Sequence, residues 1–326
     1  MTNQKHVDPN LEALGHLYAR IPFLVQRLDQ VTAALFALHH GQRSTPTQFH
    51  SLAVLQSRGP MMQVELARLM GADKSTISLV VANLLKHQLI ARAVDEDDRR
   101  RKLVSLTEKG KEFLHAGHES LENAERALMA PLSERQWEQL SFLLNKLAPQ
   151  APTSEPLSWV HNRPTWLAHR CLQSIESRLS GETGLFGLTL RQYAVLYIVF
   201  CHPGISESQA RRFLGYETSN ITLVANILAD KAMIERGQTA RFSRKCYRAS
   251  TLGGDVLRTI EPRLRAIEFE WLSGMSEEEK CTLIELLCQL VVAHADKVKA
   301  PIEPLEDVSR IPTWPVSCIR SSTFIE

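Results

Sequence analysis

Apolar residues in the first third of the chain recur at a helical period. Between residues 11 and 40 they are spaced by three and four, which places them on one face of a helix. The members of this stripe are Leu14, Leu17, Ile21, Leu24, Leu28, Val31 and Leu35. Further helices are expected over residues 47–56, 63–70 and 74–87. This part of the sequence therefore predicts one long helix followed by three shorter ones.

The segment between the last two of these helices carries residues that end one helix and start the next. Gly71 stands where a C-cap glycine is favoured, and Asp73 stands where an N-cap side chain is favoured. The apolar stripe of the following helix consists of Ile77, Val80, Val81 and Leu84. The residues left away from that stripe are Lys74, Ser75, Thr76, Ser78 and Asn83. The helix is therefore expected to expose a polar face.

After this helix the apolar period falls to two, which is typical of strands. Strands are predicted over residues 89–94 and 102–106, joined by the polar hairpin tip DEDDRRR at residues 95–101. Thr107 is then expected to cap a long helix, and Ser133 to open a capping box for the last one. A short helix, a glycine turn, a polar-faced helix and a basic hairpin form the winged helix-turn-helix pattern.

This pattern has a physical use in binding DNA. A helix fits the major groove, where short polar side chains at its amino end can reach base edges. A hairpin beside it can carry arginines to the neighbouring minor groove, where the potential is most negative. The sequence therefore predicts a DNA-binding protein.

The chain repeats the pattern once. At a constant offset of 144 residues, the segment beginning at Gln48 lies over the segment beginning at Gln192, and Gly71 lies over Gly215. The gapless match is expected from Thr45 over Thr189, through Thr107 over Thr251, to Gly110 over Gly254. With slips of one residue it extends to Arg20 over Arg163 and Arg27 over Arg170.

The repeat divides the chain into two domains of ordinary size. We expect a first winged-helix domain over residues 10–147, a linker over 148–156 and a second winged-helix domain over 157–297. The proline-rich residues 298–326 are expected to form a carboxyl-terminal tail. The expected fold class is mainly α with small β-wings, the two domains forming a pseudo-dimer within one chain.

Composition narrows this picture only a little. Of the 326 residues 44% are apolar, enough for a core, and the net charge of +2 neither requires nor excludes nucleic acid. No stretch is expected to be long and apolar enough to span a membrane, and no secretory signal is apparent, so we expect a cytoplasmic protein. The six cysteines show no CxxC pairing and are expected to be mostly small buried residues.

The sequence of the first wing, DEDDRRRKLVSLTEKG at residues 95–110, resembles the wing of the MarR family of bacterial regulators. Leu66-Ala67, Ser75-Thr76 and residues 89–92 also follow the family pattern. The resemblance covers both halves of the chain. It implies that Asp98 orients Arg100 toward the minor groove, and that the two copies pair through their terminal helices.

The second copy departs from this pattern in its wing. Arg244 falls where Arg100 falls, but Phe242 and Ser243 replace the acidic stretch. We therefore expect phosphate contact with altered base readout in the second half. Because the copies differ, the expected partner is double-stranded DNA whose site is an imperfect palindrome, read by two helices about 34 Å apart. The expected DNA-binding residues are Lys74, Ser75, Thr76, Ser78, Asp98, Arg99, Arg100, Arg101, Thr218, Ser219, Asn220, Thr222, Arg241, Arg244 and Lys245.

The resemblance also implies a small-molecule effector, since family members sense aromatic acids, phenols or oxidants. An arginine can pair bidentately with a carboxylate, so an aromatic carboxylate is the expected ligand class. The candidate ligand-binding residues are Arg20, Arg163, His16, His50 and His169. The alternative is that the two arginines form salt bridges on their helices and the histidines are structural.

Three other interpretations remain open at this stage. The chain lacks the common nucleotide-binding, hydrolase and zinc-protease motifs, so we expect no enzyme, no cofactor and no metal. A redox sensor would use Cys171, provided that its thiol pKa were lowered. The second copy could also be only a dimerisation scaffold that no longer reads DNA, and further association between chains stays possible.

Overall fold

The structure is a computed structural model that describes residues 20–41, 43–72, 74–94, 102–148, 163–216, 218–238 and 245–298. It divides into two compact units. The first unit is Leu28–Ser174, and the second unit combines Met1–Arg27 with Ile175–Glu326. Each unit is therefore composite, because it contains the first helix of the other sequence copy.

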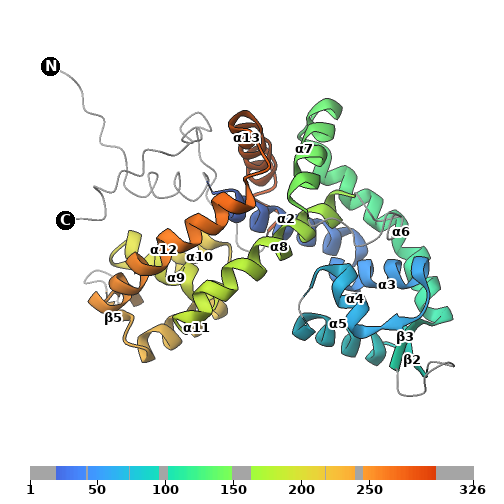
Figure 1. Ribbon diagram of the computed structural model, residues 1–326, viewed down its shortest axis with the longest axis horizontal. Helices are drawn as coiled ribbons and strands as arrows, with labels where there is room; N and C mark the ends of the chain where they lie inside the picture. Colours follow the sequence, from blue (N-terminus) through green and yellow to red (C-terminus); the bar gives the residue numbers. More distant parts are fainter. Residues whose placement is uncertain are drawn as a thin grey trace. The chain divides into compact units, whose positions relative to one another are not determined.

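The first unit contains one helix-turn-helix and its hairpin (Figure 1). Its elements are α2 (Ile21–His40) from Leu28 on, α3 (Pro46–Arg58), β1 (Met61–Met62), α4 (Gln63–Met70), α5 (Lys74–Lys86), β2 (Ile90–Val94), β3 (Lys102–Leu106), α6 (Glu108–Met129), α7 (Glu134–Leu147) and the start of α8 (Pro164–Leu185). The three strands form an antiparallel sheet in the order β1-β3-β2. This arrangement is a winged helix.

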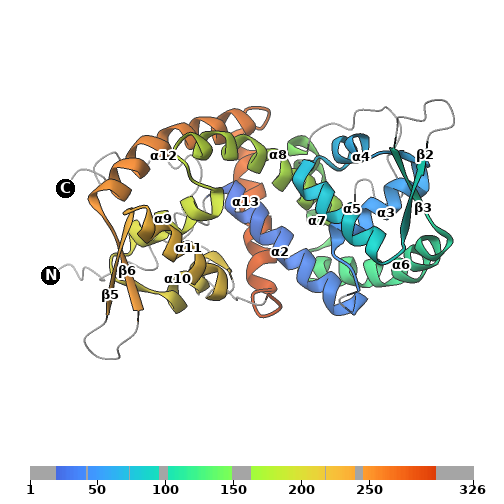
Figure 2. The ribbon, with the colours of Figure 1, turned by 90° about the horizontal axis from the view of Figure 1, so that it is seen from below.

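The second unit repeats the same order of elements. After the rest of α8 it contains α9 (Leu190–Cys201), β4 (Ile205–Ser206), α10 (Glu207–Leu214), α11 (Thr218–Asp230), β5 (Ile234–Gln238), β6 (Lys245–Ala249), α12 (Thr251–Trp271) and α13 (Glu277–Ala293). Its sheet has the order β4-β6-β5, and Figure 2 shows the β5–β6 hairpin leaving the helices of this unit.

Local signals predicted these elements well. Gly71 ends α4 in the left-handed conformation with φ of 67°, and Gly215 ends α10 in the same way with φ of 66°. Thr107 caps α6, and Ser133 forms the predicted capping box of α7. The predicted apolar stripe of α5 is buried, as Ile77, Val80, Val81 and Leu84 show. The proposed cap Asp73 lies outside the described residues.

The second hairpin is one residue shorter than the first, which corrects the gapless alignment. Ile90 and Ile234, which start β2 and β5, are 144 residues apart, but Lys102 and Lys245, which start β3 and β6, are 143 apart. The cap equivalent to Thr107 is therefore Ser250. The expected match of Thr107 with Thr251 and of Gly110 with Gly254 was wrong by one residue.

Close packing explains why the glycine itself keeps the shorter register. A Cβ added at Gly110 would lie 2.1 Å from the carbonyl oxygen of Leu89, and one at Gly253 would lie 2.1 Å from that of Met233. Both helices pass the end of their hairpin too closely for a side chain. Gly253 is therefore the equivalent of Gly110, and the alignment of Arg244 with Arg100 across the shorter hairpin is no longer unique.

Helix α2 also corrects an expectation. By length and composition its 20 residues, with mean hydropathy 1.2, meet the test for a membrane-spanning helix, although no such segment was expected. The pair α8 and α9 passes the same test only together, and it bends by 73°. More than half of the α2 window is buried inside the protein, and a core helix passes this test as well. Most of the predicted linker and tail, residues 149–162 and 299–326, lies outside the described residues.

Candidate functional site

Helix α5 of the first unit exposes the polar face that its sequence predicted. Lys74, Ser75 and Ser78 are exposed, and Thr76 is half-buried. The hydroxyl of Ser78 accepts a hydrogen bond of 2.8 Å from Nε2 of Gln63 at the start of α4, which ties the two helices of the motif together. The apolar stripe beneath fixes the rotation of α5, so these side chains point away from the core.

Helix α11 of the second unit presents a comparable face. Ser219 is exposed, while Asn220 and Thr222 are half-buried. Thr218 begins the helix, but its side chain lies outside the described residues. Neither Thr76 nor Asn220 is buried, which the DNA-reading interpretation requires.

The wing residues can be placed only in part. Asp98, Arg99, Arg100 and Arg101, and likewise Arg241 and Arg244, lie outside the described residues. Lys245 is exposed at the start of β6, and its equivalent Lys102 is exposed at the start of β3. Both hairpins therefore begin their second strand with an exposed cation.

Two leucines on these faces were not among the predicted residues. Leu79 on α5 is 74% exposed, and Leu223 on α11 is 59% exposed. They occupy equivalent positions, 144 residues apart. Their helical position could have revealed them, because each follows an expected DNA-binding serine, Ser75 or Ser219, by four residues.

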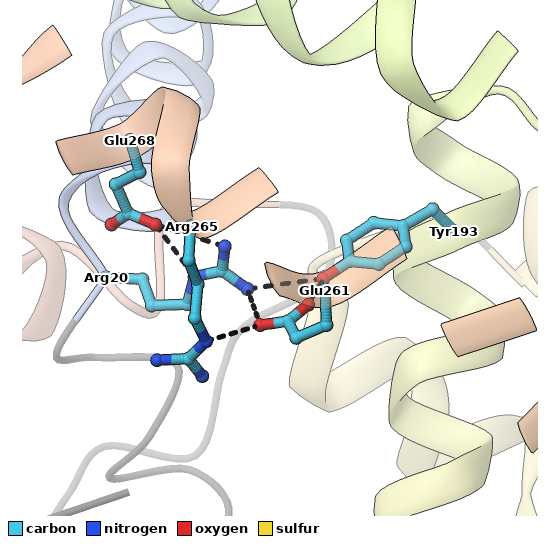
Figure 3. A network of polar contacts seen from close by, with 5 residues as sticks. All are labelled: Arg20, Tyr193, Glu261, Arg265 and Glu268. Atoms are coloured by element: carbon cyan, nitrogen blue, oxygen red, sulfur yellow. Dashed lines mark hydrogen bonds and ion pairs between the residues drawn. The ribbon is translucent and has the colours of Figure 1, made fainter. Parts of the chain in front are cut away.

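Arg20 lies in a polar cluster of the second unit, the Arg20 cluster, formed by Arg20, Tyr193, Glu261, Arg265 and Glu268 (Figure 3). Its guanidinium pairs with Glu261 at 3.2 Å and with Glu268 at 3.0 Å, and donates to the hydroxyl of Tyr193 at 3.3 Å. The Tyr193 hydroxyl in turn donates to Glu261, which also pairs with Arg265 at 3.1 Å.

The charges of this cluster support one another. Burial alone disfavours the charged form of Arg20, yet the carboxylates of Glu261 and Glu268 raise its pKa well above the usual value. Burial likewise acts to raise the pKa of Glu261, but Arg20, Tyr193 and Arg265 hold that pKa below its usual value. The cluster is therefore a network of charged groups with two cations and two anions. The interpretation of Arg20 as a salt-bridged residue describes its contacts.

Arg163 lies in the corresponding cluster of the first unit, the Arg163 cluster, formed by Arg163, Glu122, Glu125, Thr165 and His50. The guanidinium pairs with Glu125 at 2.6 Å and with Glu122 at 3.5 Å. Thr165 donates to the other oxygen of Glu125 at 2.9 Å, and its hydroxyl lies 3.3 Å from Nε2 of His50. Burial raises the pKa of Glu125 in spite of Arg163 and Thr165.

Two buried histidines adjoin Arg163 and carry ring nitrogens without a hydrogen-bond partner among the described residues. These atoms are Nδ1 of His50 and Nε2 of His169. Burial, with the nearby charges of His169 and Arg163, lowers the pKa of His50 to about 3, so its imidazole is neutral. The other nitrogen of His169, Nδ1, lies 3.3 Å from Asp29.

Three of the five predicted ligand residues, Arg163, His50 and His169, thus meet in the first unit. Arg20 belongs to the second unit, and His16 lies outside the described residues. Buried polar atoms ordinarily have partners, so the two unpaired ring nitrogens mark a place where hydrogen-bonding capacity is unused.

The next residue of α8, Arg170, contacts the turn of the helix-turn-helix. Its guanidinium donates to the carbonyl oxygen of Leu69 at 3.4 Å, and a Cβ at Gly71 would lie 1.8 Å from its Nη1. In the second unit, Gln26 of α2 donates at 3.3 Å to the hydroxyl of Tyr216, which immediately precedes α11. In both units a first helix therefore touches the segment before a DNA-facing helix.

The cysteine that a redox sensor would need is protected. Cys171 is fully buried and its thiol donates to the carbonyl oxygen of Leu144 at 3.2 Å. Burial raises its pKa far above the usual value, the opposite of what a reactive thiol requires. Cys288 is also buried, whereas Cys201, Cys246 and Cys281 are partly exposed, so the expectation of buried cysteines holds only in part.

Comparison with known proteins places these features in a family. The model of the MarR family matches residues 44–102. The repressor MdtR of Bacillus subtilis is 32% identical over 150 residues, which are 44% of this chain and 94% of MdtR. The repressor NicR of Pseudomonas putida is 31% identical over 103 residues, 32% of this chain and 65% of NicR, so the match spans less than two thirds of that relative. A probable transcriptional regulator of Pseudomonas aeruginosa of known structure is 41% identical, covers 39% of this chain and 96% of its own, and superimposes with a TM-score of 0.38.

Proposed function

The chain belongs to the MarR family, and from that premise we propose that it is a sequence-specific DNA-binding regulator of transcription, a repressor released by a small ligand. The observation that carries the proposal is helix α5, whose short hydroxyl side chains face outward beside a hairpin rich in arginine. The proposed protein performs no catalysis and acts in the cytoplasm, where the DNA lies.

The proposal includes two winged-helix domains, residues 10–147 and 157–297, which act as a pseudo-dimer within one chain. The recurrence of the element order and of the strand order supports it. In such a pseudo-dimer α5 and α11 each enter a major groove, about one helical turn apart. Arg100 and Arg244 enter the flanking minor grooves, where a narrow groove attracts arginine.

Differences between the two helices support an imperfect palindrome as the DNA site. Lys86 near the end of α5 corresponds to Asp230 at the end of α11, so the charge facing the DNA reverses there. A cation attracts phosphate while a carboxylate repels it or accepts from a cytosine amino group. The two half-sites therefore differ most at the positions that the carboxyl-terminal turns of the helices approach.

The ligand site of this proposal is the Arg163 cluster. An aromatic carboxylate would replace Glu125 at Arg163, and the raised pKa of Glu125 means that this buried carboxylate is the more easily displaced partner. The unpaired nitrogens of His50 and His169 offer further hydrogen bonds. Trp166, whose ring centroid lies 5.3 Å from that of His50, offers an apolar surface.

Helix α8 connects this site to the DNA-binding motif within the first unit. It carries His169, in contact with Asp29, and next to it Arg170, in contact with Leu69 at the end of α4. A ligand that moves the start of α8 would shift Arg170 and with it the turn before α5. Because α5 must fit the major groove closely, such a shift would lower DNA affinity.

A second candidate function treats the second unit as a dimerisation scaffold. The observation in its favour is the sequence of the second wing, which lacks the acid–arginine arrangement of the first. In that case the chain would bind one half-site.

Selection of duplexes from a random pool tests both candidates. The full chain should enrich a family of related duplexes, and its affinity for them should fall steeply with salt concentration. Arg100→Ala and Arg244→Ala should each weaken binding if both units read DNA, whereas only Arg100→Ala should do so if the second is a scaffold. Failure to enrich any duplex would refute the regulatory function.

A further inference from the structure

The face of α5 opposite its buried stripe is centred on a leucine. Residues spaced by four and three line this face: Ser75, Leu79, Ala82 and Lys86. All four are exposed, and Leu79 is 74% exposed although the helix offers buried positions on its other side. An exposed leucine at the centre of a polar face gains nothing from the fold.

The second unit places a leucine at the same point. The corresponding line on α11 consists of Ser219, Leu223, Asn226 and Asp230. The first two positions are the same in both units and the last two differ. A serine followed one turn later by an exposed leucine is thus a shared feature of two helices whose other outward residues have changed.

The surroundings of Leu79 indicate what kind of surface covers it. A stable protein interface buries about 800 Å² on each partner, far more than one leucine among serine, alanine and lysine offers. The sequence of α5, KSTISLVVANLLK, contains two lysines and no acidic residue. One apolar group on a cationic helix matches an anionic partner that presents a single apolar group.

We propose that Leu79 and Leu223 are specificity-determining residues, each packing against the C5 methyl group of a thymine in the major groove. This methyl group is the one apolar feature on the base edges there, and it distinguishes thymine from the other bases. The inference rests on the proposed DNA binding and names one element of its readout. Because the leucine is shared, both half-sites contain the thymine at the equivalent position.

Removal of single methyl groups tests the contact. A duplex enriched by the full chain from a random pool is resynthesised with each thymine replaced in turn by deoxyuridine, which lacks only the methyl group. The affinity of the chain for each labelled duplex is then measured by fluorescence anisotropy. Burial of one methyl group corresponds to about a fourfold change in affinity.

The wild-type chain should lose about fourfold at one thymine in each half-site. Leu79→Ala should abolish the loss at one of these thymines and Leu223→Ala at the other. Leu38→Ala is the matched control, because Leu38 is 68% exposed on α2 and should leave both losses unchanged.

Three results would overturn the inference. An enriched duplex whose affinity is the same with thymine and deoxyuridine at every position would do so while leaving DNA binding intact. So would methyl losses that persist in both leucine variants, or a leucine variant that changes the oligomeric state instead of the methyl dependence. If no duplex is enriched at all, the proposed function and this inference fail together.

Discussion

The Arg20 cluster and the Arg163 cluster are built on the same ion pair, yet their surroundings differ. Arg163 pairs with Glu125 in the first unit as Arg20 pairs with Glu268 in the second, and both residues of each pair are related by an offset of 143. The second unit adds Arg265 and Tyr193, so every carboxylate there faces a cation.

The first unit instead has glutamate at the position of Arg265 and histidine at the position of Glu261. These residues are Glu122 and His118, which pair with each other at 3.2 Å. The pKa of buried Glu125 is consequently raised, whereas that of Glu261 is lowered. The comparison teaches that one copy of the ion pair has become a complete structural network. The other has been left with one strong cation and two unpaired imidazole nitrogens.

Removal of the arginine should have the largest effect and should separate the two clusters. Arg20→Met leaves Glu261 and Glu268 buried with a single cation, so it should cost about 3–5 kcal/mol of stability. Arg163→Met should cost only about 1–3 kcal/mol, because Glu125 already favours its neutral form. Hydrogen exchange of peptides from α12 and from α6 reports each unit separately. Equal losses would contradict the comparison.

Ligand binding should depend on the first cluster alone. In a screen of benzoate and its hydroxylated derivatives against a duplex-bound chain, Arg163→Met and His50→Leu should weaken ligand-induced release by about tenfold or more, equivalent to about 1.4 kcal/mol. Tyr193→Phe, in the other cluster, is the control and should leave release unchanged. Calorimetric titration should find one ligand per chain, and two equal sites would refute the assignment to the first unit.

The pH dependence of stability should have opposite signs in the two clusters. The stability that Glu261 contributes is present above its usual pKa of 4.5 and is lost as the pH falls through its lowered folded value. Glu125 has a raised folded pKa, so its charge destabilises the fold at neutral pH and this penalty is relieved on acidification through that value.

Conservative variants measure these two contributions. At pH 7, Glu261→Gln should cost about 1 kcal/mol, while Glu125→Gln should be neutral or slightly stabilising. The difference of each from the wild type should shrink toward pH 3 in urea unfolding. A loss of the same size for both variants at pH 7 would show that the two carboxylates have equivalent environments.

Helix capping provides the smallest test. Ser206 and Gln209 form a capping box at the start of α10, whereas α4 begins at Met62, which makes no side-chain cap. Ser206→Ala should cost about 1 kcal/mol, and Met62→Ser, with Glu65 three residues on, should add about 0.5 kcal/mol. Thermal unfolding measures both, and destabilisation by Met62→Ser would indicate that the partly exposed methionine is needed for packing.

Most element boundaries were predictable because their signals are local. The strand Lys102–Leu106 and the helix Gln63–Met70 were predicted to the residue. The hairpin register was not, because the one-residue deletion lies among polar residues that resemble each other in either alignment. It became visible only when Gly253, rather than Gly254, was found against the carbonyl of Met233.

The candidate ligand site was predicted in part for a similar reason. Arginine and histidine were recognised as residue types that bind carboxylates, but Glu125 and Thr165 were not named. Their contacts with Arg163 and His50 join residues 38 to 115 positions apart. No periodicity or spacing along the chain reports such a contact.

The sequence by itself determined the helices, the strands, their caps and the duplication, since each depends on the chemistry of a few neighbouring residues. Only the tertiary structure decided how Arg20 and Arg163 are used. Arg20 meets Glu268 across 248 residues of chain, and whether a buried cation is fully neutralised depends on every element packed around it. The same arginine therefore completes a network in one copy and leaves unused hydrogen-bonding groups beside it in the other.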